Sequence, residues 1–197
     1  MRTSSLGRHQ APKWIIAAIS MSICLGAWSA ETEMHVLGYP LGGKLSAAPK
    51  ICPLKSENSK TLCWVGAPAT LKGGGKSGLV HLPSPDSRPE WAAHAMFKML
   101  IRKDLTVDSL EVRTFSGLKG PTIDASISAR FGAPTSPRIQ SGDLVSSTWA
   151  RQDVHIRMAC RLSDFCLVMF RSPVSQAKLN EELRARSATN TARPISP

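Results

Sequence analysis

Cysteine is the residue type in this chain with the widest chemical repertoire, because a thiol can act as a nucleophile, a metal ligand or one half of a disulfide. The 197 residues include five cysteines. Cys24 lies in an apolar N-terminal segment, and the other four form two spaced pairs, Cys52 with Cys63 and Cys160 with Cys166. Their intervals, C-x10-C and C-x5-C, differ from the short C-x-x-C type of spacing in zinc ribbons. We therefore expect no metal ligand among them.

The glycine-rich string from Lys72 to Ser77 is the segment closest to a nucleotide-binding loop. The motif G-x-x-x-x-G-K-[ST] would need a glycine at the position of Thr70. The helix that must follow such a loop has no room before Pro83. We therefore interpret the string as a mobile glycine loop and expect no cofactor.

The spacing of the histidines and carboxylates predicts no catalytic residue. No two histidines beyond the N-terminal segment are closer than 13 residues, and neither H-x-x-x-H nor G-x-S-x-G occurs. The carboxylates near predicted loops have no partner that the sequence places across a cleft, as a glycosidase would need. The residues considered are His35, His81, His94, His155, Asp86, Glu90, Asp104 and Asp108.

The first thirty residues have the composition of an export signal. Three basic residues and no acidic residue precede an apolar segment, Trp14–Trp28. Small residues follow this segment, and the first acidic residue is Glu31. The apolar core is shorter than the roughly 20 residues that a spanning helix needs. The sequence predicts a signal peptide over residues 1–30 with cleavage near Ser29 or Ala30. The mature protein is expected to be periplasmic or secreted, with no transmembrane segment.

Export makes disulfides the expected use of the four remaining cysteines, because an even set of cysteines in an oxidising compartment tends to pair. Four cysteines allow three pairings, and we predict the local one, Cys52–Cys63 with Cys160–Cys166. A hairpin that aligns the second pair also aligns two apolar pairs on one face. These are Met158 with Val168 and Ile156 with Phe170.

The chain is basic, with 25 lysines and arginines against 14 acidic residues. Residues 1–30 contain three of the basic residues and no acidic one, so 22 and 14 remain, a net charge of +8. Such a charge favours association with anionic lipid head groups or lipopolysaccharide, while scattered basic residues also serve solubility alone. We expect a protein partner or an anionic envelope component, and no nucleic acid.

Alternating apolar residues predict two antiparallel hairpins. Residues 94–102 and 107–115 form the first, and residues 154–160 and 166–170 form the second, after a strand at 144–150. Hairpins of this kind with few helices are typical of the α+β class. We therefore predict a mainly antiparallel sheet, stapled by disulfides, with one packed helix and a C-terminal helix.

The packed helix is expected where Ile123, Ile127 and Phe131 make a single apolar stripe. Thr122 is its expected N-cap, and Gly132 follows its last turn.

The C-terminal helix is expected to begin after Pro173 with Ser175 as its cap. The sequence from Ser187 onward is polar and lacks an apolar pattern. We therefore place a single domain at residues 31–186 and a disordered tail at 187–197.

Exposed aromatic residues are the remaining lead to a binding site. Trp91 follows a proline-rich connector and is the tryptophan that we expect to be the most exposed. Trp91, Arg88 and Lys98 would together form a partner-binding group, because tryptophan and arginine are enriched in binding hot spots. The alternative is an indole that folds back onto the core.

The segment Ala129–Thr135, with the sequence A-R-F-G-A-P-T, resembles a helix-end pattern in small exported proteobacterial proteins. The opening Leu37–Gly42 and the early cysteine pair resemble the same group. A looser likeness is to envelope modules of the BamE/SmpA type, which are lipidated at a cysteine, whereas here Ile23 precedes Cys24 where a small residue is needed. The resemblance implies a compartment and a shape, and it carries over no catalytic residue.

The sequence as a whole favours an exported, non-enzymatic binding or envelope-associated protein. Two alternatives stay open, namely an inhibitor of a secreted hydrolase and an envelope hydrolase with an unrecognised site. A rigid exposed loop rich in aromatic residues would favour the inhibitor. A deep pocket with converging acids or histidines would favour the hydrolase.

The export signal makes the first testable prediction. Mass spectrometry of protein recovered from the periplasm or the medium should show an N-terminus near Ala30 or Glu31, because signal peptides are cleaved after small residues. Exported material that still begins at Met1 would contradict the prediction.

Overall fold

The computed structural model describes residues 34–53, 59–83, 88–116 and 119–191. The predicted signal peptide and residues 192–197 of the predicted tail lie outside the described residues. The strands are β1 Met34–Val36, β2 Tyr39–Leu41, β3 Lys50–Ile51, β4 Cys63–Trp64, β5 Ala69–Thr70, β6 Lys76–His81, β7 Met96–Ile101, β8 Val107–Arg113, β9 Ser136–Ser141, β10 Leu144–Ala150, β11 His155–Arg161 and β12 Cys166–Arg171. The helices are α1 Gly120–Phe131 and α2 Pro173–Thr191, with a 3-10 turn, η2, at Glu90–Ala92.

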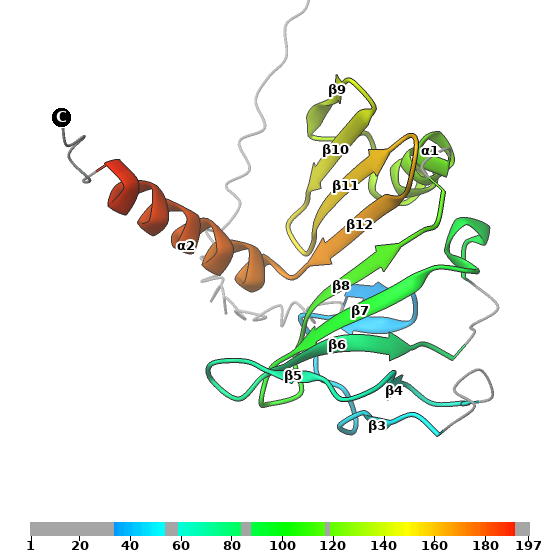
Figure 1. Ribbon diagram of the computed structural model, residues 1–197, viewed down its shortest axis with the longest axis vertical. Helices are drawn as coiled ribbons and strands as arrows, with labels where there is room; N and C mark the ends of the chain where they lie inside the picture. The colour runs from blue at the N-terminus through cyan, green and yellow to red at the C-terminus, as the bar shows by residue number, and fades with distance from the viewer. Residues whose placement is uncertain (1–33, 54–58, 84–87, 117–118, 192–197) are drawn as a thin grey trace, which may run out of the picture. The chain divides into compact units, whose positions relative to one another are not determined.

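These strands form a mainly antiparallel sheet in the order β3-β4-β6-β7-β8-β12-β11-β10-β9 (Figure 1). The short strands β1, β2 and β5 lie off this path, where β1 pairs with β2, β2 with β8, and β5 with β6. Two short pairings are parallel, β2 with β8 and β3 with β4. The predicted α+β class with a mainly antiparallel sheet is confirmed. None of the described helices has the length and apolar composition that crossing a membrane requires.

The hairpin of β11 and β12 has the predicted register. Cys160 is opposite Cys166 and forms a disulfide with it, and the apolar pairs Met158–Val168 and Ile156–Phe170 follow on the same face. All six side chains are buried. The other predicted disulfide, Cys52–Cys63, is also present. Since side chains alternate along a strand, this register fixes which face of the sheet enters the core.

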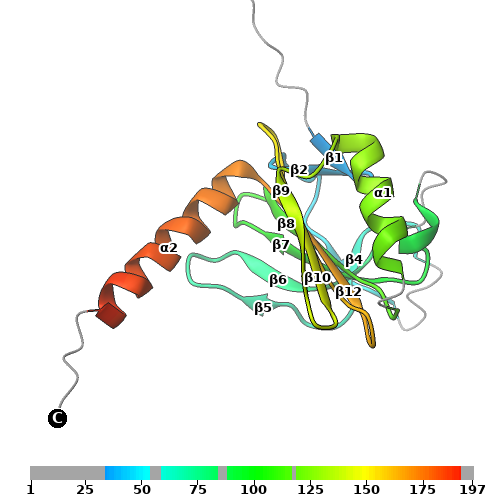
Figure 2. The same cartoon turned by 90° about the horizontal axis from the view of Figure 1, so that it is seen from above.

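Helix α1 covers that inner face, and Figure 2 shows it on one side of β10 and β12. Ile123 is fully buried and Ile127 is 3% exposed, as the apolar stripe predicts. The N-cap prediction is wrong, because the helix begins at Gly120 and Thr122 lies inside it. Pro121 occupies the first turn, where its fixed φ favours helix initiation and its missing N–H has no cost.

The start of α1 lies directly against the buried disulfide. A Cβ built on Gly120 would be 3.1 Å from the Sγ of Cys160 and 3.8 Å from the Sγ of Cys166. Only glycine allows this approach without displacing a neighbour. The N-terminus of the helix and the hairpin bridge therefore share one packing contact.

The end of α1 is held from strand β10 and the residue after it. The indole Nε1 of Trp149 donates to the Gly132 carbonyl at 3.0 Å, and the Arg151 guanidinium donates to the carbonyls of Phe131 at 2.7 Å and Ala133 at 2.6 Å. The last carbonyls of a helix lack partners within the helix, so these bonds satisfy them, and the positive charge suits the negative end of the helix dipole.

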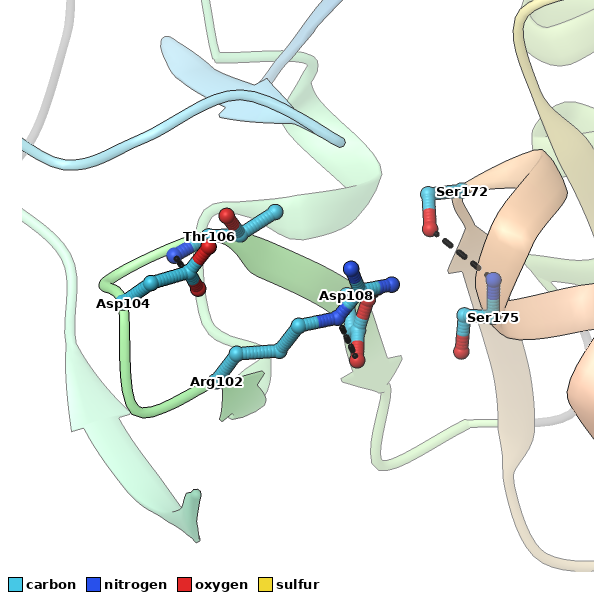
Figure 3. A network of polar contacts seen from close by, with 6 residues as sticks. All are labelled: Arg102, Asp104, Thr106, Asp108, Ser172 and Ser175. Atoms are coloured by element: carbon cyan, nitrogen blue, oxygen red, sulfur yellow. Dashed lines mark hydrogen bonds and ion pairs between the residues drawn. The ribbon is translucent and has the colours of Figure 1, made fainter. Parts of the chain in front are cut away.

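A polar network fixes the start of α2 next to the turn between β7 and β8 (Figure 3). The buried Asp108 accepts a hydrogen bond from the Arg102 Nε at 2.9 Å and pairs with the other guanidinium nitrogen. The backbone N–H of Ser172 donates to the Asp108 carbonyl, and the Ser172 hydroxyl accepts from the N–H of Ser175. Ser172 is therefore the cap of α2, in place of the predicted Ser175.

Helix α2 also continues past Ser187, where the disordered tail was predicted to begin, and ends at Thr191. Two i,i+4 hydrogen bonds stabilise this helix: the Gln176 side chain donates to the Asn180 side chain, and the Ser187 hydroxyl donates to the Leu183 carbonyl. Local hydrogen bonding and helix propensity can sustain a polar helix without an apolar stripe.

The packing of α1 gives a stability prediction. Ile127→Ala should lower the free energy of unfolding by about 2–4 kcal/mol, because it removes a buried side chain between helix and sheet. Thr122→Ala is the matched control on the exposed side of the same helix and should change it by less than about 0.5 kcal/mol. Urea unfolding followed by circular dichroism measures both. A similar small loss for the two variants would contradict this packing.

Candidate functional site

The three residues predicted to bind a partner do not form one exposed group. Trp91 is 5% exposed and belongs to the core, so of the two alternatives the indole that folds back onto the core is the one observed. The cause is the turn η2, which folds the segment after the proline connector back onto the sheet and buries Ala92 as well. Lys98 is exposed on β7, and because side chains alternate along a strand it faces away from its buried neighbour Phe97.

Arg88 is half-buried and has a structural role. Its Nη2 donates to the carbonyls of Leu82 at 2.8 Å and Pro83 at 2.9 Å, and its guanidinium lies 4.9 Å from the centre of the Phe97 ring. Burial lowers the pKa of Arg88, and the nearby Tyr39 opposes this effect. These contacts hold the end of β6 against the core.

A hollow of about 300 Å³ lies beside Arg88, between the end of β6 and the start of β7. Its two polar lining side chains are already bonded, Arg88 to backbone carbonyls and His81 Nε2 to the Ser59 carbonyl at 3.1 Å. Most of the other lining residues are apolar, including Leu79 and Met96. The described part of this hollow therefore offers an apolar surface with no converging acidic groups.

The face of the sheet opposite α1 carries the most distinctive group of charged residues. Directly opposed residues on neighbouring strands share a face, and the registers link Leu79, Lys98, Glu111, Met169 and Arg157 into one row across five strands. Two parallel rows flank it. We call the outward side chains of this surface the open face: Leu79, Met96, Lys98, Leu100, Glu111, Arg113, His155, Arg157, Leu167, Met169 and Arg171.

The open face combines cationic and apolar side chains. Lys98, Arg113 and Arg157 are exposed, and Glu111 is the one acidic residue in the set just defined. Arg113 lies over the ring of Phe165, with 4.1 Å between its Cζ and the ring centre. Leu79 and Met96 add apolar surface at the β6–β7 end, where they are 42% and 36% exposed. A face of this composition suits an anionic surface that also accepts apolar groups.

Three cationic or titratable side chains gather at one end of the open face. His155 is directly opposite Arg171, and Arg157 lies two residues further along β11 on the same face. We call these three residues the cationic cluster. Arg171 is held by its Nη1, which donates to the Gln176 side-chain oxygen of α2 at 3.3 Å.

The cationic cluster shifts the pKa of its own members. Burial lowers the pKa of His155 below its ordinary value of 6.5, and the charges of Arg171 and Arg157 lower it further. Burial and Arg157 likewise lower the pKa of Arg171, while Glu111 opposes the change. Arg157 and Arg171 are diagonal neighbours on adjacent strands, and the repulsion between their charges would be relieved by a bound anion.

The spacing of the histidines predicts no catalytic role for His155 and does not group it with the two arginines. The sequence does indicate this pairing, because extending the predicted register by one pair beyond Ile156–Phe170 places His155 opposite Arg171. In the described part of the chain, no group of three or more histidine, cysteine, aspartate or glutamate side chains is placed to hold a metal ion. Comparison with protein-family models, curated proteins and solved structures gave no match.

The electrostatics of the cationic cluster can be tested directly. In an NMR titration, the pKa of His155 should lie below 6.5, and Arg171→Gln should raise it by removing the facing positive charge. In the wild type, the folded protein binds the proton of His155 more weakly than the unfolded chain does. The free energy of unfolding should therefore decrease as the pH falls below about 6.5. Arg161→Gln, on the same strand but outside the cluster, is the control. An unchanged His155 pKa in Arg171→Gln would contradict the pairing.

Proposed function

We propose that this protein is an exported binding protein that associates with an anionic surface of the cell envelope through its open face. The observation that carries the proposal is the excess of lysine and arginine over acid on that face, next to exposed Leu79 and Met96. A flat cationic surface with apolar neighbours is the chemistry that peripheral lipid-binding proteins use. Two disulfides are also consistent with an oxidising compartment.

The open face concentrates positive charge, since its four basic residues against one acidic residue give 4 − 1, or +3, of the net charge of +8 expected after signal cleavage. Charges that serve only solubility are distributed with both signs interspersed, whereas the registers bring Lys98, Arg113, Arg157 and Arg171 onto one face with Glu111 as the acid among them. Each basic residue near a charged membrane surface contributes about 1 kcal/mol to binding. Several weak contributions of this size produce reversible, salt-sensitive association.

The proposal is tested by retention on vesicles of phosphatidylcholine with and without phosphatidylglycerol, across a salt series. Binding to the anionic vesicles should fall steeply toward physiological salt, where the Debye length is about 8 Å. The double variant Lys98→Gln/Arg157→Gln should bind roughly 25-fold more weakly, from about 1 kcal/mol for each charge.

A second double variant separates the open face from net charge. Lys178→Gln/Arg184→Gln removes the same charge from exposed positions on α2, and it should bind nearly as well as the wild type. Equal losses in the two double variants would show that only net charge matters. Absence of retention at low salt would overturn the proposed function.

A further inference from the structure

The cationic cluster is more specific than the rest of the open face, because its three members are fixed by strand register. Directly opposed side chains in an antiparallel pair have Cβ atoms about 4.5–5.5 Å apart. His155 and Arg171 occupy such a pair, and Arg157 is the next outward residue on β11. The three side chains can therefore converge on a single small anion, whereas the rest of the open face presents only scattered charges.

The groups that face His155 come from each neighbouring strand. Strand β12 contributes Arg171, and β11 itself contributes Arg157, while Ala150 of β10 is the apolar partner on the other side. Glu111 of β8 acts on Arg171 and is the acidic group that the cluster meets. Among the described residues that act on this cluster, two guanidinium groups against one carboxylate leave an excess of positive charge.

We propose that His155, Arg157 and Arg171 form a binding site for a phosphate monoester displayed on a lipid surface, and that protonation of His155 strengthens this binding. Two arginines match the charge of a monoester, which approaches −2 near neutral pH, better than the single charge of a phosphodiester. Guanidinium groups also fit phosphate oxygens through paired hydrogen bonds. The inference rests on the proposed function and names the ligand of that surface.

A lipid-borne phosphate is favoured over a free one by the surroundings of the cluster. Met169 is directly opposite Arg157, and Leu79 and Met96 lie at the β6–β7 end of the same face, four and three strands from β11. A lipid layer lying along the open face can contact these apolar side chains while the arginines hold a headgroup. A free anion would gain nothing from these residues.

Bound phosphate reverses the local field at His155. In the free protein, burial and two arginines keep the imidazole neutral near pH 7. A bound dianion favours the imidazolium, so binding takes up a proton and strengthens as the pH falls. The phosphate monoester loses charge over part of the same pH range, so the contribution of His155 must be measured against a variant that lacks it.

The headgroup test compares phosphatidylcholine vesicles containing phosphatidic acid with vesicles containing phosphatidylglycerol at equal surface charge. The wild type should bind the phosphatidic acid vesicles about tenfold more tightly, the effect of one or two charge-assisted hydrogen bonds. Arg171→Gln should remove this preference, whereas Arg161→Gln, with the same charge change on β11, should keep it. Equal wild-type binding to both vesicles overturns this inference and leaves the proposed function standing. Absence of binding to both kinds of vesicle overturns this inference and the proposed function together.

The pH test uses the same phosphatidic acid vesicles with the wild type and His155→Gln at about pH 7.5 and about pH 6. The affinity ratio of wild type to variant should rise as the pH falls, and a constant ratio would overturn the role of His155. Titration of the wild type with inorganic phosphate needs no variant, and the pKa of His155 observed by NMR should rise. A rise without a vesicle preference would identify free phosphate as the ligand and overturn the lipid assignment.

Discussion

The register between β11 and β12 is the constraint on which the rest of this structure depends. Side chains alternate along a strand, so a shift by one residue would exchange the two faces of the hairpin. The observed register directs Ile156, Met158 and Cys160 into the core. By the same geometry it directs His155 and Arg157 to the open face. The core and the proposed binding surface are thus two results of one alignment, and neither can change without the other.

The inner face is completed by polar contacts as well as by apolar packing. Asp124 of α1 accepts a hydrogen bond from the buried hydroxyl of Ser147 at 2.8 Å, which links the middle of the helix to β10. Trp149 and Arg151 hold the end of the same helix by its carbonyls. Hydrogen bonds of known direction restrict the helix to one position, whereas apolar burial alone tolerates small shifts. The helix thus covers the face of the sheet opposite the open face.

The parts of the structure that depend on local pattern could be predicted from the sequence. The β11–β12 register and the buried side chains Ile123 and Ile127 follow from periodicity. The sequence left two alternatives open for Trp91, because its burial depends on how η2 folds onto a distant part of the sheet. The cationic cluster falls between these cases. Its register was implicit in the hairpin, but recognising it as a surface requires knowing which face α1 covers.

The contact of Gly120 with the Cys160–Cys166 bridge couples the formation of this disulfide to the docking of α1. Two thiols cannot approach as closely as two bonded sulfur atoms, and the Cys160 sulfur lies only 3.1 Å from a Cβ built on Gly120 at the start of α1. By thermodynamic reciprocity, whatever stabilises the docked helix also stabilises the oxidised hairpin, and by the same free energy. Formation of the Cys160–Cys166 disulfide would therefore favour docking of α1 on the sheet. In a chain that stays reduced, the strands would have the same apolar alternation, but the docking of α1 would be less stable.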